Sequence, residues 1–202
     1  MLDKTLLKFD ETTHVYTYAG KKIPSVTRIL RPISEKIYGD VPRYNMAKAA
    51  SRGTDIHYAI ELYNEFGVIE IDEEHRPYLD AYIEFKKSWN HEPEKSEYMV
   101  GSEMGYAGTL DNLGKIVSGR AVIDYKTTAK VYRDLVGLQL SAYRQALREE
   151  YIEVDTGMCL WLQKTGKYSA IFYDKKQLDN YFNDFQALLT AQKIIKFYGG
   201  KK

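Results

Sequence analysis

The chain has 202 residues, of which 44% are hydrophobic and 28% charged, as expected for one globular domain. It has no apolar run near the roughly 20 residues that cross a bilayer and no signal-peptide pattern at its start, so we expect a cytoplasmic protein without a membrane anchor. A net charge of +1 gives no overall attraction to nucleic acid, and the single cysteine, Cys159, excludes an internal disulfide and a four-cysteine metal or iron–sulfur site.

The N-terminal half is predicted to contain one hairpin and three helical segments. Residues 14–23 alternate as a β-hairpin that turns at 19–21. Ser25 then suits the N-cap of a short helix ending near Leu30. Residues 42–66 have the apolar spacing of a helix, with Gly53 as a candidate break, and residues 73–89 form a second amphipathic helix.

The C-terminal half is richer in strands. Residues 96–128 favour strands, and a helix is predicted over about 135–151. Residues 159–173 read as a hairpin that turns at Thr165-Gly166, and a helix follows over about 176–197. Cys159 lies in an apolar run and is predicted to be a buried structural thiol. No repeat or linker interrupts the chain, so we expect one α/β domain over residues 1–202.

The stretch AVIDYKTT, residues 121–128, places two charges in an otherwise apolar strand. Because side chains alternate along a strand, Asp124 and Lys126 share one side while Ile123 and Tyr125 share the other. Buried charges cost several kcal/mol unless they pair, bind a metal or receive hydrogen bonds. A structural salt bridge and an edge strand with a solvated face are the simpler explanations for this tripeptide.

A third charge joins this pair through the preceding turn. If Ser118-Gly119 form a two-residue hairpin loop, Val117 faces Arg120 and Asp111 faces Lys126. Parity then places Asp111, Asp124 and Lys126 on one face of the hairpin, whereas a one-residue slip would separate Asp111 from the others.

Two carboxylates and a lysine on one sheet face suit metal-assisted phosphate chemistry. Carboxylate oxygens are the ligands that magnesium prefers, and an adjacent lysine can stabilise charge on a phosphate. The glycines Gly105 and Gly108 before Asp111 would allow the backbone to approach a substrate closely. An ion-paired hairpin is the alternative.

The order of several motifs resembles the PD-(D/E)xK nuclease superfamily, and most closely its RecB-like exonuclease branch. The segments in order are IPSVTRIL, GTDIHYAIE, GYAGTLD, IDYKT and GLQLSAYRQAL. The first is similar to a segment of phage-encoded members and of the mitochondrial genome maintenance exonuclease. The resemblance implies a restriction-endonuclease-like fold, in which helices flank a central mixed β-sheet, here with an N-terminal β-hairpin.

The resemblance also implies roles for individual residues. Asp111 and Asp124 would bind the metal, with His57 and the carbonyl of Tyr125 as further ligands. Lys126 would be the catalytic lysine. Gln139 and Tyr143, one helical turn apart, would support the site and contact the substrate backbone. Glu97 and Glu103 compete for one additional acidic position on the preceding strand, and each could equally be a surface carboxylate.

The implied activity is that of a Mg²⁺- or Mn²⁺-dependent DNA exonuclease, acting from single-stranded or duplex ends in phage or prophage recombination, replication or repair. A motor or recombination partner would be a separate protein, because the chain has no Gly-rich phosphate loop. The iron–sulfur cluster of many relatives is excluded by the cysteine count. An endonuclease of the same superfamily and a non-catalytic DNA-binding module are the alternatives. The candidate phosphate contacts are Arg28, Arg43, Lys48, Arg52, Lys130 and Arg133.

Overall fold

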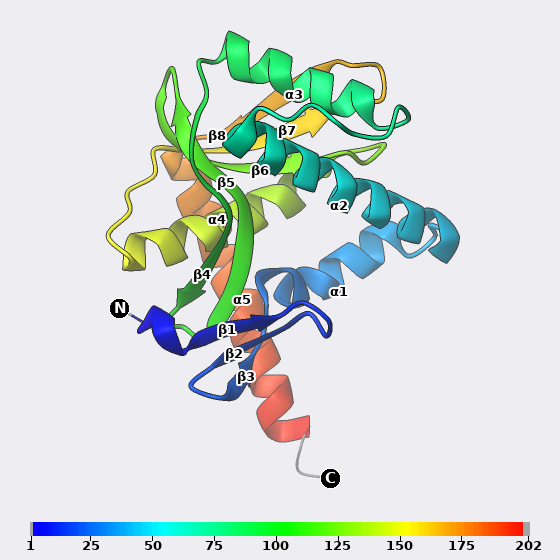
Figure 1. The fold of residues 1–202 in the computed structure, drawn as a ribbon. Coiled ribbons are helices and arrows are strands. Elements are labelled where there is room, and N and C mark those ends of the chain that lie inside the picture. Colours follow the sequence, from blue (N-terminus) through cyan, green and yellow to red (C-terminus); the bar gives the residue numbers. More distant parts are fainter. Residues whose placement is uncertain (1, 200–202) are drawn as a thin grey trace.

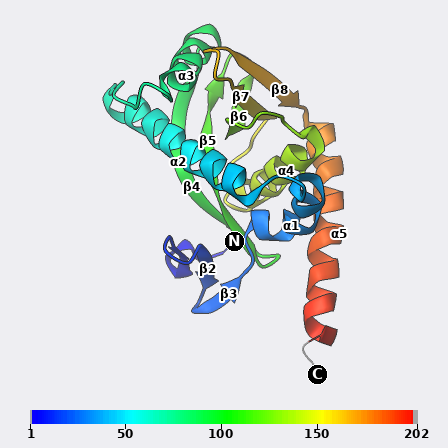
Figure 2. The same ribbon diagram turned by 90° about the vertical axis from the view of Figure 1, so that its right-hand side faces the viewer.

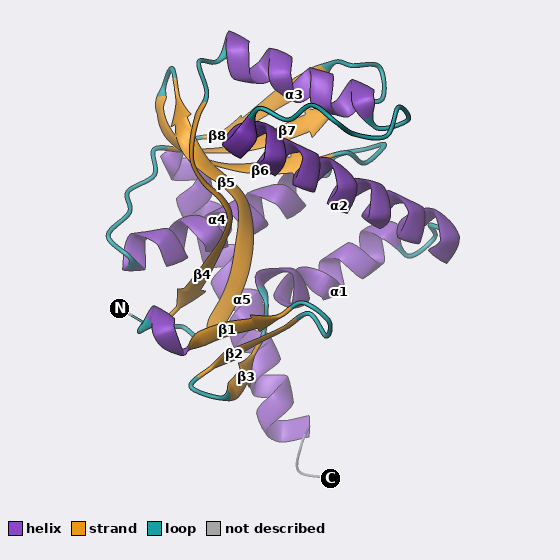
Figure 3. Ribbon diagram, viewed as in Figure 1, coloured by secondary structure: helices purple, strands orange, loops and turns teal. Residues whose placement is uncertain are grey.

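The computed structural model describes residues 2–199, which fold around a five-stranded sheet flanked by helices (Figures 1 and 3). The strands lie in the order β4-β5-β6-β7-β8. Their bounds are β4 Glu92–Ser102, β5 Tyr106–Ile116, β6 Gly119–Lys126, β7 Thr156–Leu162 and β8 Tyr168–Tyr173. Only β6 and β7 are parallel, and helix α4, Arg133–Glu149, makes the crossover between them. The predicted mixed sheet is confirmed.

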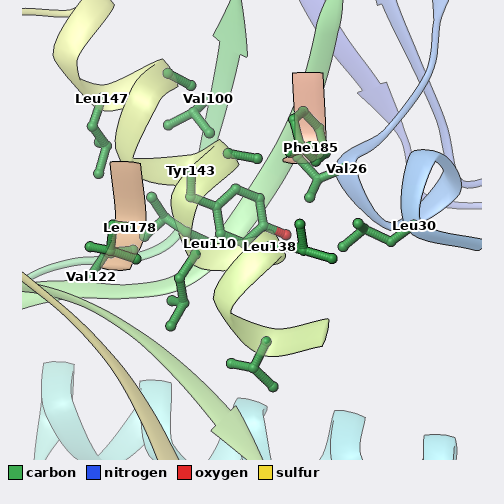
Figure 4. Close-up of a cluster of buried hydrophobic side chains, with 14 of the residues drawn as sticks. Val26, Leu30, Val100, Leu110, Val122, Leu138, Tyr143, Leu147, Leu178 and Phe185 are labelled. Carbon is green, nitrogen blue, oxygen red and sulfur yellow. The ribbon is translucent and has the colours of Figure 1, made fainter. Parts of the chain in front are cut away.

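Helices cover both faces of the sheet. Helices α2, Arg43–Phe66, and α3, Arg76–Ser88, pack on one face, and α4 packs on the other with α1, Val26–Tyr38, and α5, Lys175–Gly199. The strand β6 shows why two cores form, because Val122 belongs to the α4 side while Ile123 belongs to the α2 side. Figure 4 shows the α4-side core. The predicted alternation along β6 therefore holds.

A separate three-stranded sheet lies beside the ends of β4 and β5 (Figures 1 and 2). It contains β1, Leu7–Asp10, β2, Val15–Tyr18, and β3, Lys21–Ile23, after a short 3-10 turn at Lys4–Leu6. The predicted hairpin corresponds to β2 and β3, and the additional strand β1 was missed. Its packing explains it, because Leu7 is buried in a small core against β5.

Two helices differ from their predicted form. Ser25 caps α1 as predicted, accepting a hydrogen bond from the backbone N–H of Arg28, but α1 continues past Leu30 to Tyr38. The later turns are held because Ile33 packs against the α4-side core. Helix α2 runs unbroken through Gly53 and ends at Gly67, whose φ of +69° closes the helix. The candidate break at Gly53 was therefore wrong.

The remaining predicted elements agree with the structure within a few residues. The 159–173 hairpin is β7 and β8, and Gly166 in its turn has a positive φ of 75°. Cys159 is buried and has a free thiol, as predicted. Within residues 2–199, none of the helices combines the length and apolar character needed to span a bilayer.

Candidate active site

The β5–β6 hairpin has a different register from the predicted one. Ile116 pairs with Gly119, so the two loop residues are Val117 and Ser118 rather than Ser118 and Gly119. Gly119 takes a φ of +118°, which a side chain would resist, so the glycine closes the turn instead of occupying its centre. If this register is continued along both strands, Asp111 lies opposite Asp124 and not opposite Lys126. The observed register differs from the predicted one by two residues, which is the side-chain repeat of a strand. Asp111 therefore stays on the predicted face.

The two strands separate where these carboxylates lie. Pairing between β5 and β6 stops at Asn112 and Ile123, although β5 continues to pair with β4 as far as Tyr106. The backbone N–H of Tyr125 donates instead to Oδ2 of Asp111, at 2.6 Å. The Asp111 side chain thus replaces a ladder acceptor between the two strand ends.

Asp124 is a buried carboxylate without adequate hydrogen bonding. It is 1% exposed, and the Lys126 ammonium lies 2.6 Å from its Oδ2. The Lys126 ammonium is the donor beside Oδ2, whereas Oδ1 has no hydrogen-bond partner among the described residues. Burial raises the pKa of Asp124, the charge of Lys126 opposes this, and Asp111 adds to the rise. Lys126 offsets part of the cost of burying this charge, and Oδ1 remains available as a ligand atom for a second cation.

A histidine from α2 completes the acidic end of the site. Nδ1 of His57 lies 3.5 Å from Oε1 of Glu97 and 3.8 Å from Oδ1 of Asp111. Its other nitrogen, Nε2, lies 3.3 Å from the carbonyl oxygen of Tyr125. Burial disfavours the charged imidazole, but Asp111 and Glu97 outweigh burial and raise the pKa of His57 to about 9. One ligand atom from each of His57, Glu97 and Asp111 fits within a 4.8 Å cluster.

Glu97 and Glu103 occupy different places. Glu97 lies between Ser96 and Tyr98, whose partners on β5 flank Asp111, so it faces Asp111 across the strand pair. Its φ is +44°, a strained value for a residue with a side chain, and such strain is concentrated at functional sites. Glu103 lies in the turn after β4, where its backbone N–H donates to Glu149. The structure brings Glu97, and not Glu103, to His57.

The pair predicted on α4 is assembled as expected. Nε2 of Gln139 lies 3.3 Å from the hydroxyl oxygen of Tyr143, and both side chains follow one face of the helix. The Tyr143 ring is buried in the α4-side core, as Figure 4 shows. The position of this ring also corrects the expectation that Gly108 lets the backbone approach a substrate, because a Cβ at Gly108 would lie 2.6 Å from the ring. Gly108 makes room for Tyr143 rather than for substrate.

The donor set fits a hard divalent cation. The carboxylates of Asp111 and Glu97 and the imidazole of His57 form one cluster, and the carbonyl of Tyr125 lies beside the imidazole. The carboxylate of Asp124 lies outside that cluster, and its Oδ1 has no hydrogen-bond partner among the described residues, which its ion pair with Lys126 through Oδ2 does not explain.

Residues 70–198 match the family model described as the PD-(D/E)XK nuclease superfamily. The match covers more than half of the chain. The chain belongs to this superfamily. The matched range contains Glu97, Asp111, Asp124 and Lys126, whereas His57 lies before it.

One solved structure shares this fold. A protein from Eubacterium rectale, provisionally named an exonuclease, has a crystal structure that aligns with a TM-score of 0.52 at 12% identity. The alignment covers 76% of this chain and 68% of that protein. A protein named SSO0001 aligns with a TM-score of 0.34 at 15% identity, covering 67% of this chain and 74% of its own. No curated protein sequence matches this chain.

The basic residues predicted to contact phosphates do not form a single group in this superfamily member. Arg52 is partly buried, donates to the carbonyl of Thr127 at 3.0 Å and lies over the Tyr78 ring, so it ties α2 to the end of the lysine strand. Lys48 lies 3.8 Å from Glu74 on the surface. The side chains of Arg28, Arg43, Lys130 and Arg133 are exposed.

Some residues around the site were not predicted. Tyr38 comes from the end of α1, and the charges of Lys126 and Asp124 both act on the pKa of its hydroxyl. His91 and Tyr82 form a buried hydrogen-bonded group with Asn112, the residue after Asp111. No local sequence signal marks these residues, because only the packing of distant segments brings them to the site.

Proposed function

We propose that this chain is a divalent-metal-dependent deoxyribonuclease that hydrolyses phosphodiester bonds from DNA ends. The observation that carries the proposal is the buried carboxylate of Asp124, which lies beside Asp111 and the ammonium of Lys126 and whose Oδ1 has no hydrogen-bond partner among the described residues. A buried carboxylate oxygen without a partner suits a divalent cation, which prefers oxygen ligands. The same feature would be a defect in a purely structural hairpin.

Asp111, Asp124 and His57 would hold Mg²⁺ or Mn²⁺, with the carbonyl of Tyr125 and the carboxylate of Glu97 as additional ligands. A bound divalent ion polarises a phosphoryl oxygen and lowers the pKa of bound water. Because the pKa of His57 is raised, its Nδ1 must release a proton before it can bind a cation.

Lys126 would act on the substrate phosphate. Burial opposes its positive charge, but the carboxylates of Asp124 and Asp111 raise its pKa above the ordinary value, so the ammonium stays protonated. It can then donate hydrogen bonds to the scissile phosphate or to the attacking water. Gln139 and Tyr143 would orient the substrate backbone. Burial raises the pKa of the Tyr143 hydroxyl, which keeps it a neutral donor.

We further assign the chain, as one nuclease domain over residues 1–202, to the RecB-like branch. The ordered motifs around His57, Asp111, Asp124 and Lys126 support this placement, and so does the pair of Gln139 with Tyr143. The proposed setting is phage or prophage DNA recombination, replication or repair in the cytoplasm, without an iron–sulfur cluster and together with a recombination partner protein.

The test is a comparison of end-labelled linear DNA with covalently closed circles, each single-stranded and duplex. We expect the linear forms to be consumed with Mg²⁺ or Mn²⁺ and preserved with EDTA, while circles survive. Efficient cutting of circles would instead establish an endonuclease. DNA binding without any metal-dependent cleavage would establish a non-catalytic binding module and overturn the proposal.

A further inference from the structure

Two tyrosines and a lysine gather next to the C-terminal end of β6. Tyr132 and Lys130 lie in the loop that connects β6 to α4, and Tyr38 is the last residue of α1. The rings of Tyr38 and Tyr132 meet edge to face, with centroids 5.2 Å apart and an interplanar angle of 88°. The Lys130 ammonium lies 4.6 Å from the centroid of the Tyr132 ring. We call these three residues the aromatic cluster.

The aromatic cluster is close to the proposed catalytic groups. Lys130 and Tyr132 follow Lys126 by four and six residues in the same connection. Burial raises the pKa of the Tyr38 hydroxyl, Lys126 lowers it, and Tyr132 and Asp124 raise it, so the charges of the site reach this side chain. The packing of α1 against α4 brings Tyr38 to the connection.

The connection is held in place. The Thr128 hydroxyl donates to the carbonyl of Lys130 at 2.9 Å, and the indole N–H of Trp161 on β7 donates to the carbonyl of Thr128 at 2.8 Å. These bonds limit the conformations of the segment that carries Lys130 and Tyr132. A pre-ordered segment loses less conformational entropy when a ligand binds.

Core packing does not account for the two tyrosines. Neither ring belongs to the hydrophobic clusters of the described residues, whereas Val131, between Lys130 and Tyr132, packs against the α4-side core. Both tyrosines are partly exposed. Partly exposed aromatic rings with a cation beside them can bind single-stranded nucleic acid, because bases stack on the rings and the cation attracts the phosphates.

We propose that the aromatic cluster is a subsite for one unpaired nucleotide adjacent to the scissile phosphate. The base stacks on the face of one ring of the Tyr38–Tyr132 pair, which the other ring holds by its edge-to-face contact, and Lys130 contacts a neighbouring phosphate. The inference rests on the proposed nuclease function, and it defines the substrate more narrowly as DNA that is single-stranded at this position. A base inside a duplex cannot offer its face to a side chain without being unstacked.

Binding of a short fluorescent oligothymidylate, measured by anisotropy in EDTA, tests the subsite separately from catalysis. Each oligonucleotide of a series carries one abasic residue, placed at a different position in each. For the unmodified protein, an abasic residue at one particular position should weaken binding by about 5- to 150-fold, the range expected for one aromatic–base stack. In Tyr38→Ala or Tyr132→Ala this position-specific loss should disappear, and Tyr38→Phe should retain it.

Tyr198→Ala is the matched control. Tyr198 forms an exposed edge-to-face pair with Phe197, at 5.0 Å and 89°, near the end of α5 and away from the central sheet (Figures 1 and 2). This variant should show the full abasic loss. Lys130→Ala should reduce the slope of log affinity against log salt by about 0.7, the value for one phosphate contact with a single strand.

Equal weakening of all oligonucleotides by Tyr38→Ala, or the absence of any sensitive position in the unmodified protein, would overturn the subsite. If Tyr38→Ala does not fold, judged by circular dichroism and melting, Tyr132→Ala decides the question. Magnesium-dependent cleavage of the same unmodified oligonucleotide by the unmodified protein is scored in parallel. If no position is sensitive but cleavage is retained, only this inference is rejected, whereas failure to cleave both the oligonucleotide and linear duplex DNA rejects the proposed function.

Discussion

Two adjacent residues of β5 lead into two different polar clusters. Asp111 belongs to an acidic cluster with His57, Glu97, Asp124 and Lys126. Asn112, the next residue, belongs to an amide cluster in which its side-chain oxygen lies 3.0 Å from Nε2 of His91. The other members of the amide cluster are Tyr82 and Asn64.

The two histidines respond to these partners in opposite ways. His57 faces carboxylates, which overcome the effect of burial and raise its pKa to about 9. Burial lowers the pKa of His91 to about 4, and the hydrogen bond with Asn112 opposes that shift only partly. His57 is therefore charged at neutral pH in the metal-free protein, and His91 is neutral.

This difference separates a binding site from a structural network. The amide cluster joins α2, α3 and β5 through side-chain hydrogen bonds, and the Lys86 ammonium donates to the same Asn64 oxygen as Tyr82, at 2.9 Å. The acidic cluster leaves Oδ1 of Asp124 buried without a partner among the described residues and places Glu97 in a strained conformation. Hydrogen bonds between buried side chains stabilise the fold, whereas a buried carboxylate oxygen without a partner is available to a cation.

The largest effect should come from Asp124→Asn. The substitution keeps the shape of the side chain but removes a charged ligand, so cleavage should fall by at least ~10³-fold, while the fold and DNA binding stay nearly intact. Initial rates with Mg²⁺, together with DNA affinity in EDTA, measure both effects. Near-normal cleavage would mean that the acidic cluster is no more a metal site than the amide cluster.

Lys126→Ala should also lose cleavage, but it should keep magnesium affinity and a near-normal melting temperature with metal present. A bound cation would then take over neutralisation of Asp124 from the lysine. Calorimetric magnesium titration and thermal melting with and without metal test this separation. If Lys126 were only a structural partner, its loss would cost about 3–5 kcal/mol of stability, and added magnesium would restore nothing.

His57→Gln probes the charged histidine directly. We expect metal affinity to fall by at least about 10- to 100-fold, the loss typical of removing even an outer-shell partner of a metal site. Higher metal concentrations should recover part of the cleavage activity, and a metal titration of the initial rate measures this recovery. Unchanged metal dependence would remove His57 from the ligand set while leaving Asp111 and Asp124 in it.

His91→Gln should have the smallest effect on cleavage and a clear effect on stability. We expect a loss of about 1–3 kcal/mol near neutral pH, because the partners of a buried histidine are left imperfectly paired. Cleavage per folded molecule should change by no more than a few-fold. Urea unfolding and initial rates measure the two quantities, and a metal-affinity loss as large as that of His57→Gln would contradict the comparison.

The pH dependence of the same variant sharpens the contrast. The folded-state pKa of His91 is about 4, below the ordinary value of 6.5, so its stabilisation is present above pH 6.5 and is lost as the pH falls toward 4. The stability difference between the unmodified protein and His91→Gln should therefore narrow across that interval. Urea unfolding near neutral pH and at about pH 5 measures the narrowing. A constant difference would show that His91 is not held neutral by burial.

Local sequence patterns were sufficient for the main elements of the fold. Alternation placed Asp124 and Lys126 on one side of β6 and Ile123 on the other, because side-chain direction is a property of any strand. Helical spacing likewise predicted that Gln139 and Tyr143 share one face of α4, where their side chains are in contact. Ser25 as an N-cap and Gly166 as a turn residue depend only on neighbouring backbone, and both agree with the structure.

Tertiary packing decided what local patterns could not. The β5–β6 register depends on which residues form the turn. Gly119 pairs with Ile116, so the register differs from the predicted one by two residues. Gly108 could be explained only once Tyr143, which arrives from α4, was seen against it. The burial of Asp124 and the contact between Tyr38 and Tyr132 both depend on segments far apart in the chain. Burial and long-range contacts are properties of the folded chain, so no short stretch of sequence determines them.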